Sequence, residues 1–374
     1  MDDRLKIGFF CAHDPYDRRS FSGTPSYMLD ALGRRDDIVL RVLGPYRRGY
    51  RGKLLSAWRR WRKTPLRGPE AGAVKELDWV IVPVSSRFIP ERRGAAGPKF
   101  VHVTDATPQF LRDFYARPTS RQADLVEQTA LERADLVVYS SGYMAGRALA
   151  EFGGADAAKI HAISFGLNLD ALPPPPGAKP PPDPLKLIFI GKNWQTKGGI
   201  IAAEANEILN RRGIASELTV IGGRPDDPSR YGNARFLGYL DKGRAKDYRL
   251  LTRSLSQAHL FVLPTQADCT PMVVAEANAH GVPAVINEIG GISSLVREGE
   301  NGFLMDPGSD AAAYADKIAR ILSDRPGFDA LAAGSYEYCR NNLTWDAWAR
   351  DMIALIRRDP EKARHSRIAG REAG

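Results

Sequence analysis

Cysteine is scarce in this sequence. The 374 residues include three cysteines, Cys11, Cys269 and Cys339, which lie far apart. Their spacing fits neither a metal-binding motif nor a disulfide framework, so we expect a reducing compartment and no metal site. No apolar run approaches the roughly 18 residues that cross a bilayer, and the polar start, Met1 to Lys6, is unlike a signal peptide. These absences predict a cytoplasmic protein.

Two glycine motifs that bind phosphate groups are also absent. No GxGxxG fingerprint follows the first predicted strand of either half of the chain. Its absence argues against a dehydrogenase, in which that fingerprint holds the pyrophosphate of a dinucleotide. The sequence also lacks the GxxxxGK[ST] loop of P-loop proteins. Any phosphate group must therefore be held by other means.

Acidic residues are missing from one strongly basic segment, residues 46–68. This segment holds nine lysines or arginines, which equals the whole net charge of +9. Its leucines and tryptophans recur at helical spacing, and a basic amphipathic stretch with tryptophans is typical of contact with an anionic membrane surface. The residues expected to make that contact are Arg47, Arg48, Trp58, Arg59, Arg60 and Trp61. A solvated insertion is the alternative, and nucleic acid is the weakest interpretation because nothing else resembles a nucleic-acid module.

Short apolar runs alternate with helical patterns along the chain, which predicts parallel sheets with helices on both faces. The predicted strands are Leu5–Phe10, Ile38–Leu43, Trp79–Val84, Phe100–Val103, Leu136–Tyr139, Lys159–Ile163, Leu187–Ile190, Leu218–Ile221, Phe236–Leu237, Leu260–Leu263, Ala284–Ile286 and Gly302–Met305. Helices are expected, among other places, at Pro271–His280, Ile292–Glu298 and Thr344–Arg357.

A proline-rich segment divides this pattern in two. Eight of the twelve residues from 173 to 184 are proline, which excludes a helix or a central strand and suits a semi-rigid linker. We therefore predict an α/β protein of two Rossmann-like domains facing a central cleft. The first domain is residues 1–172, the linker 173–185 and the second domain 186–342. Residues 343–374 form a C-terminal helix, expected to pack back on the first domain, and a tail.

Two carboxylates flank the predicted helix start after the strand Leu260–Leu263. Asp268 precedes, and Glu276 follows, the pair Thr270-Pro271, which suits an N-cap and a first helical position. Glu276 would lie roughly 7–8 Å further along the helix, about the reach from a diphosphate to a ribose. The segment alone is equally compatible with an ordinary capped helix that carries an acid on its exposed face.

Backbone and lysine donors near this helix could bind a diphosphate. The N–H groups of Met272 and Val273 would lie unpaired in the first turn, at the positive end of the helix dipole, although the Thr270 side chain could take one of them. Lys192 and Lys197 leave the end of the strand Leu187–Ile190 and could neutralise a leaving diphosphate. The alternative is a pair of solvated loop lysines.

Two residues of the first domain are expected to border the same cleft. Gly23 precedes a Thr-Pro helix start and would let a ligand approach the backbone closely. Asp105 follows a strand that should end at the cleft, where it could bind an acceptor hydroxyl. A plain strand-to-helix turn and a turn-capping aspartate are the respective alternatives.

Taken together, these residues resemble those of the retaining glycosyltransferases of the GT-B type, in the large family 4 that uses nucleotide-sugar donors. The resemblance covers nearly the whole chain. Its strongest part is the E-x7-E region from Asp268 to Glu276. The other matching segments are Ser22-Gly23-Thr24-Pro25, Thr104-Asp105-Ala106-Thr107, Phe165-Gly166-Leu167-Asn168, Gly191-Lys192, Lys197-Gly198-Gly199, Gly281-Val282-Pro283, Gly290-Gly291 and Asn301-Gly302-Phe303.

The resemblance implies roles for the site residues. Glu276 would hold the ribose hydroxyls and Asp268 would lie near the transferred sugar. Lys192 and Lys197 would bind the diphosphate, and Gly23 would let it approach the first domain. The residues implied to bind the donor are thus Gly23, Lys192, Lys197, Thr270, Pro271, Met272, Val273 and Glu276, and those closest to the chemistry are Asp268, Asp105 and Lys197. The sequence departs from the family's usual pattern in having Asp268 in place of a glutamate and Lys192 in place of an arginine.

The expected activity is transfer of a hexose, with retained configuration, from a UDP or GDP sugar to a glycan or lipid-linked acceptor in cell-surface polysaccharide or glycolipid synthesis. The resemblance implies no cofactor and no essential metal. A sugar-nucleotide epimerase, a glycogen-type synthase and a non-catalytic membrane-surface binding protein are the alternatives. The expected location is cytoplasmic, with a peripheral position on the inner face of the membrane and no nucleic-acid partner.

Overall fold

The computed structural model describes residues 4–11, 14–43, 74, 76–90, 97–115, 119–177, 179 and 181–358. The membrane-surface prediction for residues 46–68 lies outside these residues. None of the described helices is both long and apolar enough to cross a membrane.

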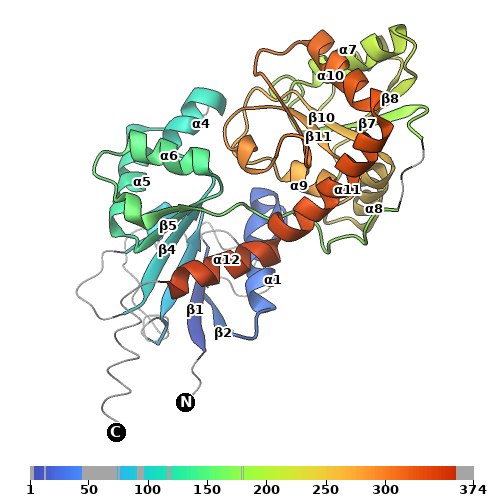
Figure 1. Ribbon diagram of the computed structural model, residues 1–374. Helices are drawn as coiled ribbons and strands as arrows, with labels where there is room; N and C mark the ends of the chain where they lie inside the picture. The colour runs from blue at the N-terminus through green and yellow to red at the C-terminus, as the bar shows by residue number, and fades with distance from the viewer. Residues whose placement is uncertain are drawn as a thin grey trace.

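The first sheet has six parallel strands in the order β2-β1-β3-β4-β5-β6. The strands are β1 (Leu5–Phe10), β2 (Ile38–Leu43), β3 (Trp79–Pro83), β4 (Lys99–Thr104), β5 (Leu136–Tyr139) and β6 (Ile160–Ala162). Its helices are α1 (Thr24–Gly33), α4 (Pro108–Tyr115), α5 (Arg121–Arg133) and α6 (Gly142–Glu151). Figure 1 shows this domain on the side of the two termini.

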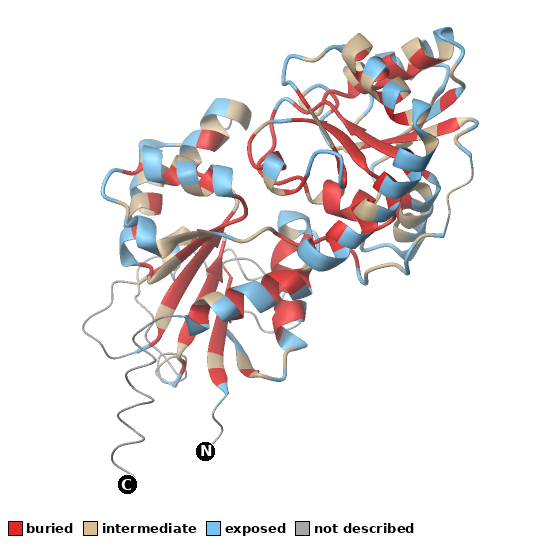
Figure 2. Cartoon of the chain, in the orientation of Figure 1, coloured by how far each residue is buried: buried red, intermediate tan, exposed pale blue. Residues whose placement is uncertain are grey.

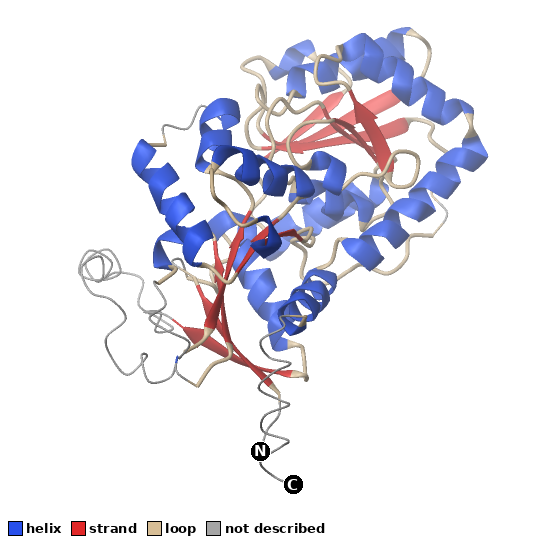
Figure 3. Ribbon diagram, turned by 60° about the vertical axis from the view of Figure 1, so that its left-hand side comes forward, coloured by secondary structure: helices blue, strands red, loops and turns tan. Residues whose placement is uncertain are grey.

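The second sheet also has six parallel strands, in the order β12-β11-β10-β7-β8-β9. The strands are β7 (Leu185–Gly191), β8 (Ser216–Gly222), β9 (Ala234–Gly238), β10 (Leu260–Leu263), β11 (Ala284–Asn287) and β12 (Gly302–Met305). The helices are α7 (Gly199–Arg211), α8 (Ala245–Gln257), α9 (Met272–Asn278), α10 (Ala311–Ser323) and α11 (Arg325–Asn342). Helices flank the strands of both sheets (Figure 3).

Burial of the strands explains why they are so apolar. A parallel sheet covered by helices on both faces buries successive side chains of each strand, not alternate ones. Every residue of β3, β10 and β11 is buried, and the central strands of both sheets form continuous buried bands (Figure 2). The predicted α/β architecture of two domains is therefore confirmed.

The last helix returns to the first domain, as predicted. Helix α12 (Trp345–Arg357) packs beside α1, and its apolar stripe joins the core beneath β1 and β3. Trp348 and Met352 are fully buried there, together with Ile7 and Trp79. The chain therefore crosses between the domains twice, once before the linker and once after α11 (Figure 1).

One predicted helix is wrong. The segment Ile292–Glu298 forms only a short 3-10 turn, Ile292–Ser294. The side chain of Asn301 accepts a hydrogen bond from the backbone N–H of Arg297 at 2.7 Å. This bond takes a donor that a continuing helix would direct to a carbonyl of the preceding turn, so the chain turns away toward β12.

Candidate functional site

The predicted site residues lie at the carboxyl ends of strands in both sheets, where ligands bind in open α/β folds. Asp105 follows β4 directly, and the loop after β1 leads through Gly23 into α1. In the second domain, Lys192 and Lys197 follow β7, and Asp268 lies in the loop between β10 and α9. One set comes from each domain, and the two sets face one another where the carboxyl ends of the two sheets meet.

Lys197 and Asp268 form an ion pair at this edge. The Lys197 ammonium lies 2.5 Å from Asp268 Oδ2 and donates a second hydrogen bond to the carbonyl of Ala267 at 2.8 Å. Both side chains are mostly buried, with 17% and 11% of their surface exposed. Gly191 makes room for the lysine, because a Cβ there would lie 2.9 Å from Lys197 Cβ. Burial and pairing hold both charges in fixed positions.

Tyr115, which the sequence analysis missed, reaches this pair from the first domain. Its hydroxyl, at the end of α4, donates to Asp268 Oδ1 at 3.4 Å, and the Lys197 ammonium lies 5.6 Å from its ring centroid. Burial raises the pKa of Tyr115, and the negative charge of Asp268 raises it further. The hydroxyl is therefore a neutral donor at physiological pH.

Asp105 belongs to the same electrostatic cluster. Its charge contributes to the raised pKa of Tyr115 and, after burial itself, to the raised pKa of the Cys269 thiol. The structure thus brings together residues from both domains that the sequence placed in one cleft. No sequence signal indicated Tyr115, because it lies at the far end of α4, which carries no motif.

The predicted start of the helix that carries Glu276 is wrong by one residue. Pro271 has an extended backbone and is itself the N-cap, so α9 begins at Met272. The hydroxyl of Thr270 does not cap the helix, because it lies 2.5 Å from the Ser140 hydroxyl of the first domain. Within the described part of the chain, the N–H groups of Met272 and Val273 have no hydrogen-bond partner. Thr270 therefore joins the two domains and leaves both donors free.

Glu276 is buried and paired with a lysine that the sequence analysis did not identify. Lys242, in the loop between β9 and α8, binds Glu276 Oε1 and donates to the carbonyl of Asn168 at 3.1 Å. The other carboxylate oxygen, Oε2, is buried without a hydrogen-bond partner. Burial raises the pKa of Glu276, and the ammonium of Lys242 partly opposes that rise. Oε2 is thus ready to accept a hydrogen bond.

The loop before α1 has an unusual backbone around Gly23. Phe21, Ser22 and Gly23 all have positive φ angles, of 48°, 58° and 91°, a conformation that is costly for residues other than glycine. Asn168 stabilises it by donating to the Ser22 carbonyl at 2.9 Å, and Trp345 of α12 donates to Asn168 Oδ1 at 2.9 Å. Asn168 therefore connects the Gly23 loop, the returning helix and, through its carbonyl, Lys242.

Lys192 stands apart from the other predicted site residues. Its ammonium lies 5.3 Å from the ring centroid of Tyr239, an exposed side chain of the loop after β9. The two lysines of the loop after β7 thus differ. Lys197 is fixed against Asp268, whereas Lys192 is exposed to solvent. Among the residues that the structure describes, no group of three or more His, Cys, Asp or Glu side chains is arranged to hold a metal ion.

Two domains of this kind, each built on a parallel sheet of six strands with flanking helices, are the arrangement of the GT-B fold. The sucrose-phosphate synthase from Thermosynechococcus elongatus superimposes with a TM-score of 0.64 at 20% identity, over 95% of this chain and 98% of that chain. HepE from Anabaena, in complex with UDP, gives 0.63 at 16% identity, over 94% and 99%. At such identities the similarity establishes the fold alone.

Residues 184–324, in the second domain, match the family model of the glycosyl transferases group 1. Relatives by sequence include the D-inositol 3-phosphate glycosyltransferase of Thermomonospora curvata, 29% identical over 259 residues, or 62% of this chain and 58% of the relative. The protein of the same name from Xylanimonas cellulosilytica is 28% identical over 219 residues, or 54% and 51%. The match thus spans little more than half the length of these curated relatives.

Proposed function

We propose that this protein is a retaining glycosyltransferase. It moves a hexose from a nucleotide-diphosphate sugar to a glycan or lipid-linked acceptor, in the synthesis of cell-surface polysaccharide or glycolipid. The observation that carries the proposal is the mostly buried Lys197–Asp268 pair, which Tyr115 of the other domain contacts. A fixed cation can stabilise the negative charge of a leaving diphosphate, and a fixed carboxylate beside it can accept a hydrogen bond from a sugar hydroxyl. The match of residues 184–324 to the model of the glycosyl transferases group 1 supports the same class.

The proposed reaction breaks the bond between the sugar's anomeric carbon and the diphosphate oxygen. The diphosphate leaves with the electron pair, and Lys197 stabilises its developing charge. The acceptor hydroxyl attacks from the face that the diphosphate leaves and gives its proton to a leaving phosphate oxygen, which retains the configuration. Asp105 orients that hydroxyl, and Asp268 accepts hydrogen bonds from the transferred sugar. Lys197 must exchange part of its contact with Asp268 for the diphosphate.

The other residues hold the donor. The free oxygen of Glu276, Oε2, is buried and has no partner, so it is available to a ribose hydroxyl. The free N–H groups of Met272 and Val273 donate to the phosphates, and Lys192 adds positive charge at the rim of the site. Gly23 allows close approach from the first domain because it has no Cβ. Thr270 and Pro271 contribute by holding this helix start against the first domain.

The donor is expected to be a UDP or GDP sugar. HepE, which shares the fold, was solved with UDP, and this favours uridine as the first base to test. The relatives named D-inositol 3-phosphate glycosyltransferases add a phosphorylated polyol as a second candidate acceptor. We further propose that transfer needs no cofactor and no essential metal, so that a chelator leaves the rate unchanged.

Transfer from a panel of radiolabelled UDP and GDP hexoses tests this function. Lys197→Ala and Asp268→Asn should each lower kcat by about 10²- to 10³-fold, since each removes a fixed charge from the reacting groups. Glu276→Gln should mainly raise KM for the donor. The control is Asp36→Asn, at an exposed position of the first domain, which should retain full activity.

Three outcomes separate the alternatives. Full activity in both the Lys197 and Asp268 variants contradicts the proposed site. A labelled donor that returns as its epimer, without transfer, indicates a sugar-nucleotide epimerase, and growth of an α-glucan primer indicates a glycogen-type synthase. Thermal stabilisation by no nucleotide sugar at all points to a non-catalytic binding protein, because a ligand at 100 times its Kd stabilises the folded chain by about 2.7 kcal/mol.

A further inference from the structure

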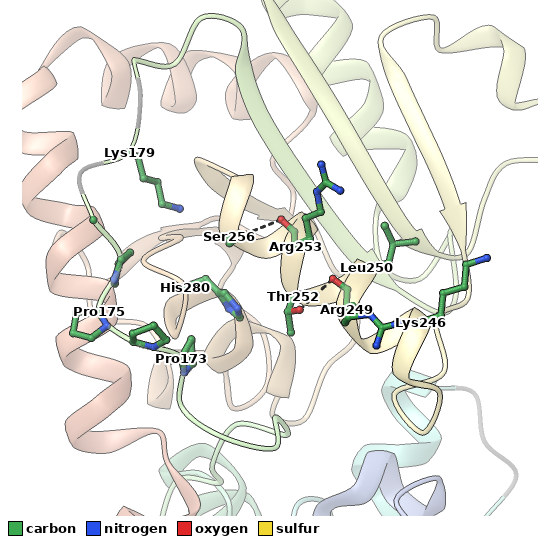
Figure 4. Close-up of a pocket in the computed structure, with 13 residues that line it drawn as sticks. Pro173, Pro175, Lys179, Lys246, Arg249, Leu250, Thr252, Arg253, Ser256 and His280 are labelled. Carbon is green, nitrogen blue, oxygen red and sulfur yellow. Dashed lines mark hydrogen bonds between the residues drawn. The ribbon is translucent and has the colours of Figure 1, made fainter.

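An open pocket in the second domain lies apart from the site described above. Its volume is about 980 Å³, and it is lined by the proline linker, by α8 and by His280, just beyond the end of α9. We call it the linker pocket and define it by Pro173–Gly177, Lys179, the α8 side chains from Lys246 to Ser256 and His280. In Figure 4, His280 lies between the prolines on one side and Thr252 and Arg249 on the other.

The linker pocket is lined by cations and by no carboxylate. Lys179 comes from the linker, and Lys246, Arg249 and Arg253 come from α8. Within the described residues, none of these four side chains forms an ion pair, although most other arginines of the described chain do. Lys246, Arg249 and Arg253 are exposed and carry unpaired positive charges that repel one another, so the pocket is electrostatically suited to an anion.

Lys179 is the most constrained of the four. Its ammonium is largely buried and donates to the carbonyl of Ala258, its one described hydrogen bond. Burial without a carboxylate partner lowers the pKa of Lys179 to about 7. Its own carbonyl accepts a hydrogen bond from Arg325 of α11 at 3.2 Å. The backbone of Lys179 is therefore held in place by Arg325, while its ammonium has a carbonyl partner but no carboxylate to neutralise it.

The walls of the linker pocket are preformed. Tyr336 of α11 donates to the carbonyl of Pro173 at 3.0 Å, and a Cβ on Gly281 would lie 2.6 Å from Pro176. Nδ1 of His280 donates to the carbonyl of Glu276 at 2.9 Å, and burial lowers the pKa of His280, so it is neutral. The prolines present rigid apolar surface opposite the cations of α8, and Leu250 adds an apolar side chain from α8 itself.

We propose that the linker pocket binds a phosphate-bearing organic anion. Arg249 and Arg253 stand one helical turn apart on α8 and hold the phosphate together with Lys179, and the prolines contact the organic part. Arginine side chains pair with phosphate through two parallel hydrogen bonds. The anion is either a soluble organic phosphate or the phosphate of a lipid headgroup, since both present the same chemistry to these side chains. The proposal does not depend on the proposed transferase activity.

Calorimetric titration of the full chain with inorganic pyrophosphate tests this site. The titration is done in a Lys197→Ala background, which removes the cation that would bind phosphate in the transferase site. Adding Arg249→Ala and Arg253→Ala should raise the Kd about tenfold or more, because each charge-assisted hydrogen bond is lost. The matched control adds Arg235→Ala and Arg320→Ala, two exposed arginines of the same domain that remove the same charge, and should bind as the background does.

A second arm identifies the source of the phosphate. The same variants are tested for flotation with vesicles that contain phosphatidic acid, against vesicles of phosphatidylcholine. Pyrophosphate binding that depends on Arg249 and Arg253, without vesicle binding that depends on them, supports a soluble organic phosphate. Vesicle binding that depends on the two arginines, without pyrophosphate binding, supports a lipid headgroup. If neither probe distinguishes the Arg249/Arg253 variant from its control, the proposal is overturned.

Discussion

Two acids of the candidate site, Asp268 and Glu276, are each paired with a lysine of the same domain. Asp268 is paired with Lys197 and Glu276 with Lys242. Such pairs keep a buried carboxylate ionised, since desolvation alone would favour its neutral form. They also mean that a donor must compete with an internal partner for each acid. If the acid is free of its lysine in only a fraction of the molecules, the apparent affinity for a ligand falls to that fraction of its intrinsic value.

The pair of Glu276 with Lys242 predicts a pH-dependent stability. Burial puts the pKa of folded Glu276 above its ordinary value of 4.5. The contribution of this residue to stability is therefore full below about pH 4.5 and is lost as the pH rises through the raised pKa. Lys242→Ala raises that pKa further, so its cost should be small at low pH and should reach about 3–5 kcal/mol at high pH.

Urea unfolding of the wild type and of Lys242→Ala, across a range of pH values, measures this effect. The control replaces Glu276 by Gln in both backgrounds, which removes the titrating group. The difference between the two backgrounds should then lose its dependence on pH. If the Lys242→Ala variant is equally destabilised at every pH with Glu276 present, Glu276 is not the group responsible.

At this scale the sequence indicated acids and lysines but not their partners. Asp268, Lys197 and Asp105 could be grouped because each follows a strand whose end is fixed by the fold. Lys242 could not, because it lies 34 residues from Glu276 in a loop whose composition is that of any solvated turn. Thr270 precedes Pro271 and so suggested an N-cap. Its actual partner, Ser140, lies 130 residues away on the other domain and could not be inferred from the local sequence.

The returning helix α12 carries two tryptophans that differ in one hydrogen bond. Trp345 Nε1 donates to Asn168, whereas Trp348 Nε1 is buried without a partner. Replacing either by Phe removes a similar volume from the core. Only Trp345→Phe leaves the buried Asn168 oxygen unpaired, so it should cost about 1–3 kcal/mol more than Trp348→Phe. Urea unfolding of both variants, followed by circular dichroism, gives the comparison. Equal losses would show that the Asn168 contact contributes nothing to stability.

Element by element, periodicity predicted the strands better than the helices. Buried parallel strands are apolar throughout and short, so their runs stand out in the sequence. Helix ends depend on single polar contacts: Ser141 caps α6 by accepting from the Met144 N–H at 3.2 Å, and Asp324 caps α11 by accepting from the Gly327 N–H at 3.0 Å. The predicted helix after Ile292 failed for the same reason, since Asn301 takes one of its N–H groups.

At the scale of the whole molecule, the positive charge is concentrated in residues 46–68, outside the described structure. We propose that this segment binds an anionic membrane surface and so gives the protein a peripheral position on the inner membrane face. Changing Arg47, Arg48, Arg59 and Arg60 to Gln should weaken binding to anionic vesicles by about 1 kcal/mol per residue. Added salt should weaken the wild-type binding as well.

Vesicle sedimentation at two salt concentrations measures this binding. The control changes four basic residues of the second domain, Arg211, Arg230, Arg235 and Arg320, to Gln, which alters the net charge equally. Loss of binding in both variants alike would mean that total charge, and not the segment, controls attachment. That result would contradict the proposed membrane contact of Trp58 and Trp61.

The two crossings of the chain between the domains lie side by side. The N–H of Leu167 donates to the carbonyl of Leu343 at 2.8 Å, and a Cβ on Gly166 would lie 2.2 Å from the backbone nitrogen of Trp345. Two connections that meet at one place form a single pivot. We therefore expect the domains to open by rotating about this point and not by moving apart. Such an opening would break the contacts of Thr270 with Ser140 and of Tyr115 with Asp268, while Leu167 and Leu343 stay together.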